Sequence, residues 1–299
     1  MIGVVIAPAC PLPGTVEGNR NHMNTVGRRT AVATATALLL TAGLTACGSS
    51  GDPAPAASAP AASAPAGASA SAATGTVTGA VTVFAAASLK ESFTALGKKF
   101  EAANPGVKVT FNFGGSSALA QSIVSGAPAD VFAAASPATM KTVTDAKAAA
   151  GTPQVFVKNT LEIAVPEGNP KHITGLKDLT GVKVALCAKE VPCGAAAVKA
   201  LQAAGVNLTP VTLEQDVKGA LTKVELGEVD AALVYRTDVQ ADAAKIDGVE
   251  FPEAAKAVND YPIAALAKAP NAAAAAAFVA YVESAEAAQA LTAAGFQAP

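Results

Sequence analysis

Residues 81–119 read VTVFAAASLKESFTALGKKFEAANPGVKVTFNFGGSSAL, and this stretch determines the fold class. Its first seven residues form an apolar run with the length of a buried strand. Apolar side chains then recur at helical spacing from Leu89 to Phe100, and apolar and polar residues alternate over 107–113, as in a second strand. A Gly-Gly-Ser-Ser turn leads into a further helix. The stretch therefore predicts a β-α-β-α unit.

The same alternation extends to the C-terminus. Strands separated by helices are typical of mostly parallel sheets flanked by helices, so we predict an α/β fold. The length from residue 79 to 299 suits one large or two modest domains. We expect further strands at 129–134, 160–166, 182–187, 229–235 and 261–267, and further helices at 136–149, 194–204, 216–226, 271–282 and 284–294.

The N-terminal part of the chain has a different character. Arg28 and Arg29 precede an apolar run over 31–46, which is shorter than the ~20 residues that span a bilayer. A basic segment followed by such a run is typical of a signal peptide. We therefore predict a signal peptide over 1–46, with Met23 as an alternative start of translation.

The segment after the predicted signal peptide begins with a cysteine and continues as low-complexity sequence. The apolar run ends in Leu-Thr-Ala-Cys, which resembles the lipobox of bacterial lipoproteins, and the resemblance implies that Cys47 is acylated. An ordinary secretory signal with an incidental cysteine is the alternative. Every residue over 48–75 except Asp52 is Ala, Pro, Ser, Gly or Thr. Such a sequence buries too little apolar surface to fold, so we expect 47–78 to be a disordered linker.

Composition excludes several functional classes for the folded part. The chain is 51% hydrophobic but only 4% aromatic, because much of the apolar content is alanine. Without the three arginines and two acidic residues that precede residue 79, 18 basic and 21 acidic residues remain, a net charge of −3, which gives no support for nucleic-acid binding. His172 is the only histidine in 79–299, so this part of the chain has too few histidines for a typical zinc site and gives little support for a histidine-based catalytic triad.

Small residues rich in hydrogen-bond donors stand at four places where a helix is expected to begin. In α/β sheets, ligands bind beyond the carboxyl ends of the strands, where helix N-termini gather. Each N-terminus offers free N–H groups and about half a positive charge, so four of them would supply about +2 without Lys or Arg. This charge matches a dianion. The four places are 87–88, 114–117, 192–194 and 214–217.

The serines at these places have a second interpretation. Ser88, Ser116 and Ser117 could each be an N-cap, which is the usual role of a serine at a helix start. Ser88 and Glu91 also form the S-x-x-E pattern of a capping box. From the residues alone, the sequence indicates at most a small-anion site.

Five segments of the sequence resemble the periplasmic molybdate-binding proteins of ABC importers. The resemblance covers 79–299 in order, and the combination of FAAASL with GAPADVF is specific. The segments are VTVFAAASLKESF at 81–93, FGGSSALAQSIVSGAPADVFAAAS at 113–136, EVPCG at 190–194, EQDVKGAL at 214–221 and ALVYRTDV at 232–239.

The resemblance implies five oxyanion-binding residues. Ser88 would use its hydroxyl and amide, and Ser116 is the second serine of the family pattern. Cys193 would donate a backbone N–H where the family has a small residue, Val217 would do the same, and Tyr235 would add a hydroxyl. Val217 could instead be only a core residue, and Tyr235 only an aromatic packed under the cleft. No cofactor is implied, and molybdenum would enter only as molybdate, without a direct protein ligand to the metal.

The oxyanion would be held by neutral donors. N–H and O–H groups donate to a fully deprotonated oxyanion, so a cleft without a carboxylate acceptor favours molybdate, tungstate or sulfate over protonated phosphate. The expected ligand is molybdate or tungstate, which have the same charge and nearly the same size.

The resemblance also implies a two-lobed (type II) solute-binding fold with the ligand between the lobes. We expect the chain to cross near 159–162 and 258–262, so that lobe one is 79–159 plus 262–299 and lobe two is 160–261. Closure of the hinge would complete the site. The expected partners are a membrane permease and a cytoplasmic ATPase, and we expect a monomer that reaches the membrane only through its lipid anchor.

Two cysteines lie in the part expected to fold outside the cytoplasm. Cys187 and Cys193 stand near a predicted strand end and the next helix start. Since secretion exposes a protein to oxidising conditions and the other two cysteines precede the fold, we predict that this pair is a disulfide. The C-x₅-C spacing is not that of thiol oxidoreductases.

Two alternatives differ in ligand or in class. One is a binding protein for sulfate, or one that prefers tungstate. The other is a secreted enzyme with Ser88 as a nucleophile. The enzyme hypothesis is disfavoured, because His172 lies in a polar loop far along the chain and no histidine is placed to activate Ser88.

Overall fold

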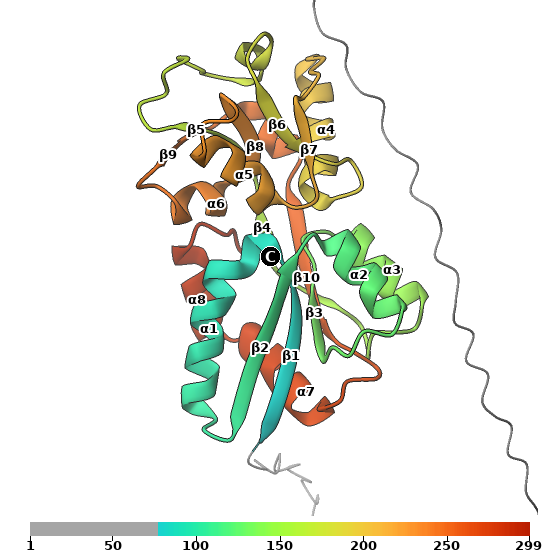
Figure 1. The fold of residues 1–299 in the computed structure, drawn as a ribbon. Coiled ribbons are helices and arrows are strands. Elements are labelled where there is room, and N and C mark those ends of the chain that lie inside the picture. Colours follow the sequence, from blue (N-terminus) through green and yellow to red (C-terminus); the bar gives the residue numbers. More distant parts are fainter. Residues whose placement is uncertain (1–76) are drawn as a thin grey trace, which may run out of the picture. The chain divides into compact units, whose positions relative to one another are not determined.

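The computed structural model describes residues 77–299, which lie within one compact unit of the chain, 70–299. The predicted signal peptide, the predicted lipidation site Cys47 and all but the end of the predicted linker lie outside the described residues. Two five-stranded sheets with flanking helices make up the fold (Figure 1).

The first sheet has the strand order β2-β1-β3-β10-β4. β1 pairs in parallel with β2 and β3, while β10 is antiparallel to both β3 and β4, so only β10 runs against the other four strands. The strands are β1 (Gly79–Ala86), β2 (Val107–Gly114), β3 (Val131–Ala133), β4 (Gln154–Asn159) and β10 (Asn259–Ala265).

The second sheet repeats this plan with the order β7-β6-β8-β5-β9. β6 is parallel to β7 and β8, and β5 is antiparallel to β8 and β9, so β5 is the one reversed strand. The strands are β5 (Leu161–Pro166), β6 (Val184–Cys187), β7 (Thr212–Glu214), β8 (Ala231–Tyr235) and β9 (Ile246–Val249).

Each sheet carries its own helices, and we call the two assemblies lobe I and lobe II. Lobe I contains α1 (Lys90–Ala103), α2 (Ser116–Val124), α3 (Pro137–Asp145), α7 (Ala272–Val282) and α8 (Ala285–Ala293); lobe II contains α4 (Pro192–Ala204), α5 (Val217–Glu225) and α6 (Arg236–Ala241). Three 3₁₀ turns are η1 (Ala87–Leu89), η2 (Leu176–Leu179) and η3 (Pro252–Lys256). The predicted two-lobed α/β fold with mostly parallel sheets is confirmed.

The chain crosses between the two sheets at two adjacent points. β4 ends in lobe I at Asn159, and after Thr160 the chain enters lobe II at Leu161. It returns to lobe I through β10, which begins at Asn259, and this residue is paired in register with Asn159. The connection between the lobes is therefore a pair of neighbouring segments.

The predicted apolar stripe of α1 forms the centre of the lobe I core. Its residues from Leu89 to Phe100 that face inward are buried. Phe93 lies 5.8 Å from Phe156 and 6.2 Å from Phe278 between ring centroids, so the helix is fixed against both a strand and a helix of the same lobe. Complete burial of each such side chain contributes about 1.5–3 kcal/mol. No helix within 77–299 is long and apolar enough to cross a membrane.

Candidate functional site

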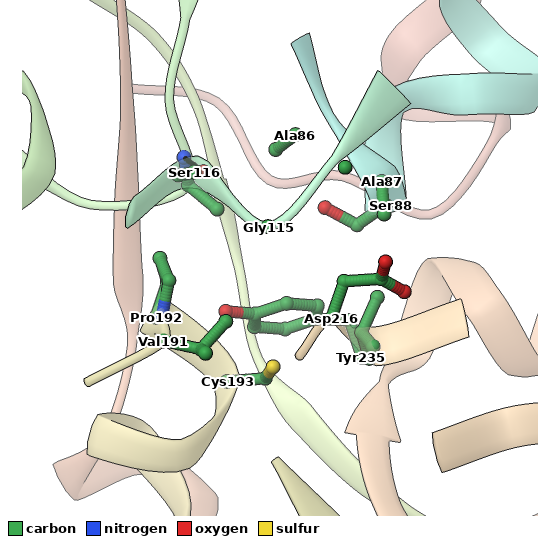
Figure 2. A pocket seen from close by; sticks show the side chains of 13 residues that line it. Ala86, Ala87, Ser88, Gly115, Ser116, Val191, Pro192, Cys193, Asp216 and Tyr235 are labelled. Atoms are coloured by element: carbon green, nitrogen blue, oxygen red, sulfur yellow. Dashed lines mark hydrogen bonds between the residues drawn. The ribbon is translucent and has the colours of Figure 1, made fainter. Parts of the chain in front are cut away.

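A small pocket lies between the two lobes and contains all five of the predicted binding residues. Figure 2 shows Ser88 and Ser116 on one side of it and Cys193 and Tyr235 on the other. The cavity has a volume of about 10 Å³, so the space between the lobes is small. The lining residues are Ala86, Ala87, Ser88, Gly114, Gly115, Ser116, Ala135, Val191, Pro192, Cys193, Asp216, Val217 and Tyr235.

Helix starts converge on this pocket from both lobes. The η1 turn that leads into α1 and the first residue of α2 contribute from lobe I, and the first residues of α4 and α5 contribute from lobe II. α4 begins at Pro192, two residues earlier than predicted. The lining includes no Lys, Arg or His. The attraction that this lining offers to an anion therefore comes from helix N-termini and not from basic side chains.

The pocket serines are not helix caps. The N-cap of α1 is Leu89 and that of α2 is Gly115, and neither start has a side-chain cap. The Ser88 Oγ lies 2.9 Å from the Tyr261 Oη, and the Ser116 Oγ accepts from the Ala135 N–H at 3.0 Å. The N-cap interpretation and the predicted capping box are therefore wrong. The hydroxyls of Ser88 and Ser116 hydrogen-bond to residues elsewhere in the chain and not to the N–H groups of their own helices.

Ser117 and Glu91 also have partners across the lobes. The Ser117 hydroxyl donates to the Glu190 carbonyl of lobe II. The Glu91 carboxylate lies 3.2 Å from the Lys218 Nζ of α5, instead of capping α1. Both contacts connect lobe I to lobe II beside the pocket.

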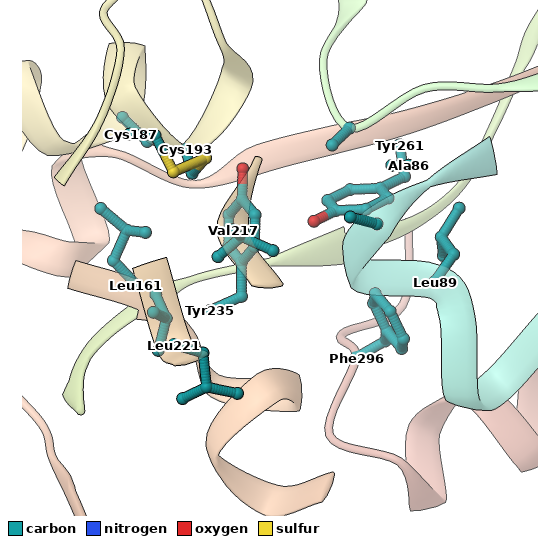
Figure 3. Packing of buried hydrophobic residues seen from close by; sticks show 14 of the residues in the cluster. Ala86, Leu89, Leu161, Cys187, Cys193, Val217, Leu221, Tyr235, Tyr261 and Phe296 are labelled. Atoms are coloured by element: carbon teal, nitrogen blue, oxygen red, sulfur yellow. A yellow bond between two sulfur atoms is a disulfide. The ribbon is translucent and has the colours of Figure 1, made fainter. Parts of the chain in front are cut away.

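Tyr235, the last residue of β8, is 1% exposed. Its Oη accepts a 2.7 Å hydrogen bond from the Asn259 Nδ2. Burial, followed by the nearby Tyr261, raises the pKa of Tyr235 well above its ordinary value, so the phenol keeps its proton. Figure 3 shows this ring beside Val217 and the Tyr261 ring. Tyr235 is thus a buried hydroxyl at the pocket wall.

Val217 and Cys193 both lie at helix starts that line the pocket. Val217 is buried, is the first residue of α5 and lines the pocket. Cys193 is the second residue of α4 and is joined to Cys187, the last residue of β6, by a disulfide with a Cα–Cα distance of 5.8 Å (Figure 3). The disulfide links the strand end to the helix start that lines the pocket.

Sequence reasoning missed one acidic residue in the pocket. Asp216 lines it, so the prediction of a cleft without a carboxylate is wrong in this respect. Its Oδ1 accepts a 3.0 Å hydrogen bond from the Gly219 N–H and caps α5. Part of its acceptor capacity is therefore used by its own helix. The available indication was an Asp at the start of the helix predicted over 216–226, a residue type that is preferred as an N-cap.

Three further buried polar residues behind the pocket were also missed. Asn159 and Asn259 stand at the two chain crossings, and Tyr261 follows in β10. Each contacts a pocket hydroxyl or the partner of one. Their contacts are far apart in sequence, so no local pattern indicated them.

A charged cluster bridges the lobes outside the pocket lining. Lys218 of α5 lies 3.2 Å from Glu91 of lobe I, 3.2 Å from Asp238 and 3.6 Å from Asp242 of lobe II. Asp238 is completely buried, and its Oδ2 accepts from the Tyr235 N–H at 3.1 Å. The cluster therefore links the Glu91–Lys218 ion pair between the lobes, through Asp238, to the backbone of Tyr235 in the pocket. Among residues 77–299, no group of three or more His, Cys, Asp and Glu is arranged to hold a metal ion.

The buried Asp238 predicts a pH-dependent stability. Burial, opposed by Lys218, raises the pKa of Asp238 from 3.8 to about 6. Between pH 4 and 6 the folded state then binds a proton that the unfolded chain does not, so this group lowers stability as the pH rises through 6. Asp238→Asn removes the titration, and its unfolding free energy relative to wild type should rise by roughly 2–3 kcal/mol from pH 4 to 7. Urea unfolding across this range measures it, and a difference that stays constant with pH contradicts the assignment.

Comparison with a family model identifies the chain. Residues 81–297 match the bacterial extracellular solute-binding protein model. The chain belongs to this family. Its members bind solutes, so the chain is a solute-binding protein and not an enzyme.

Individual relatives of this solute-binding protein bind oxyanions. The molybdate-binding protein ModA of Mycobacterium tuberculosis is 44% identical over 232 residues, which cover 76% of this chain and 82% of the relative. The periplasmic molybdate-binding protein of Azotobacter vinelandii has the same fold, with a TM-score of 0.64, 19% identity and coverage of 73% of this chain and 99% of the other. The sulfate-binding protein SubI of M. tuberculosis gives a TM-score of 0.62 at 19% identity, covering 73% and 86%.

Proposed function

We propose that this solute-binding protein captures molybdate in the cleft between its lobes and delivers it to an ABC importer. The observation that carries the proposal is the convergence of three hydroxyls and several helix N-termini on one small pocket without a basic side chain. Such a site suits a compact dianion. The relative with 44% identity is a molybdate-binding protein, which agrees with this ligand.

In this proposal, five residues form the coordination shell. Ser88, Ser116 and Tyr235 donate their hydroxyls, and Ser88, Cys193 and Val217 donate backbone amides. Each hydrogen bond to a charged oxygen contributes about 1.5–3 kcal/mol, more than a bond between neutral groups. Because the donors come from both lobes, hinge closure brings the shell together around the ligand.

The fold alone does not select between molybdate and sulfate. Structures of a molybdate-binding and of a sulfate-binding protein match this chain almost equally well. Sequence similarity favours molybdate, since the 44% identical relative binds molybdate. Tungstate has the same charge and nearly the same size, so we propose that it binds too. Sulfate is the alternative ligand.

The family description places the protein outside the cytoplasm. We propose that the ligand-bound form docks on a membrane permease driven by a cytoplasmic ATPase. We also propose that the protein is a monomer and that an acyl group on Cys47 holds it at the membrane. The linker over 47–78 would then separate the binding lobes from the bilayer.

Isothermal titration with four oxyanions tests the ligand assignment. We expect molybdate and tungstate to bind with one site per chain, and sulfate and phosphate to bind more weakly. The only pocket group that could accept the remaining proton of hydrogen phosphate is the Asp216 carboxylate, and this group already caps α5. Thermal shift measurements with the same anions give an independent readout. No response to any of the four would overturn the proposal, and sulfate binding as tightly as molybdate would overturn the ligand assignment alone.

A further inference from the structure

Each of the three pocket hydroxyls has a hydrogen-bond partner on the protein side. The Ser116 Oγ accepts from the Ala135 amide, and the Tyr235 Oη accepts from the Asn259 Nδ2. The Ser88 Oγ faces the Tyr261 hydroxyl at 2.9 Å, where either oxygen could donate. A hydroxyl that accepts from the protein keeps its own hydrogen for another acceptor. The direction of these bonds therefore determines what the pocket presents to a ligand.

The orientation of the Asn259 amide is determined by two carbonyl groups. Its Nδ2 lies 2.8 Å from the Ala135 carbonyl of lobe I and 3.4 Å from the Pro192 carbonyl of lobe II. Carbonyl oxygens only accept, so the –NH₂ group and not the amide oxygen must face this region. The same group is 2.7 Å from the Tyr235 Oη and donates to it. The Tyr235 O–H hydrogen is not used in this bond and is available to an acceptor in the pocket.

Asn159 acts on the Ser88 hydroxyl in a similar way, but through the Tyr261 hydroxyl that lies between them. Its Oδ1 accepts from the Thr160 N–H at 3.0 Å, so its Nδ2 faces the Thr237 Oγ1 at 2.8 Å and the Tyr261 Oη at 3.4 Å. The Tyr261 oxygen accepts from Asn159, which leaves its hydrogen available to donate to the Ser88 Oγ. This chain of donors leaves the Ser88 hydrogen for the pocket.

The two asparagines occupy the junction between the lobes. Asn159 is 1% and Asn259 8% exposed, and they are register partners at the end of β4 and the start of β10. Burying an amide is costly unless its groups are hydrogen-bonded. Here the bonds of both amides lead to site hydroxyls on different lobes.

We propose that Asn159 and Asn259 are specificity-determining positioning residues that fix the pocket hydroxyls as donors. This inference rests on the proposed function. A fully deprotonated oxyanion accepts from every one of these hydroxyls, whereas the proton of hydrogen phosphate needs an acceptor, which hydroxyls fixed as donors do not offer and which only the Asp216 carboxylate could provide. The hinge thus contributes to ligand selection through the direction of its hydrogen bonds.

A double-mutant cycle tests the stronger of the two relays. Asn259→Leu should weaken molybdate binding about tenfold, because the Tyr235 O–H is then free to turn away from the ligand. In the Tyr235→Phe background the same change should have little further effect, since its target hydroxyl is absent. A purely structural hinge role predicts instead that the two losses multiply.

Asn259→Asp provides a second variant of unchanged shape. Its carboxylate accepts from the Tyr235 hydroxyl and reverses the bond, so molybdate binding should fall more than in Asn259→Leu. Asn169→Asp, in a loop outside the pocket, is the control for the added charge and should bind as wild type. If Asn259→Leu proves unfolded, this pair alone determines the outcome.

The possible failures are distinguishable. If the wild-type protein binds none of the oxyanions, the proposed function fails. If the wild type binds molybdate but Asn259→Asp binds it equally well, or the losses in the cycle multiply, the positioning role is wrong and the proposed function stands. The corresponding cycle of Asn159→Leu with Ser88→Ala tests the second relay in the same way.

Discussion

Replacing Gly115 with alanine should weaken molybdate binding about 100-fold while leaving both lobes folded. Gly115 precedes α2 in lobe I, and a Cβ there would collide with the backbone carbonyl of Gln215 in lobe II. Its dihedral angles, φ −61° and ψ 126°, are ordinary for alanine, so the substitution adds no local strain. The collision arises only when the lobes meet, so the substitution destabilises the closed state and leaves the separate lobes unaffected.

The neighbouring glycine provides a matched control. A Cβ on Gly114 would meet only the Leu119 side chain, at 3.8 Å, which is an ordinary contact. Gly114→Ala should therefore keep much more affinity than Gly115→Ala, although Gly114 also lines the pocket. Titration gives the affinities, and small-angle scattering with and without molybdate reports closure. Equal affinity in the two variants would mean that the close approach of the lobes at Gly115 is not needed for binding.

Ser88→Ala should weaken molybdate binding by about 1.5–3 kcal/mol, or roughly 10- to 100-fold, because it removes a hydroxyl donor to a charged oxygen. It also leaves the buried Tyr261 hydroxyl without its 2.9 Å partner. Titration and thermal unfolding together separate the loss of binding from any loss of stability.

Ser122→Ala is the control for this substitution. The Ser122 hydroxyl donates to the Ala118 carbonyl within α2 and is not part of the pocket. We expect wild-type affinity in this variant. Unchanged affinity in Ser88→Ala, with the fold intact, would remove Ser88 from the binding shell.

The strands and helices with a strong apolar pattern could be predicted from the sequence, and three strands and one helix could not. β4 and β5 are separated only by Thr160, so the sequence gives no turn signal where the chain passes between the lobes. β7 and β9 are short, and most of their side chains are at least partly exposed, which removes the alternation. α6 has only six residues, too few for an apolar stripe.

The pocket residues could be predicted from the sequence, but the residues that hydrogen-bond to them from behind could not. The donor-rich turns at strand ends located Ser88 and Ser116, because a parallel sheet gathers those ends at one edge. The partners that orient the hydroxyls could not be predicted, since Tyr261 is 173 positions from Ser88 and Asn259 is 124 from Ala135. The predicted serine caps failed for the same reason, as long-range hydrogen bonds replaced the local ones.

Anomalous diffraction from crystals grown with molybdate, measured at the molybdenum edge, tests the central claim most directly. We predict one molybdenum peak between the Ser88 and Tyr235 hydroxyls, with ligand oxygens about 2.7–3.1 Å from these groups, from Ser116 and from the amides of Cys193 and Val217. A peak at another place on the protein, or a cleft without a peak at saturating molybdate, would contradict the account.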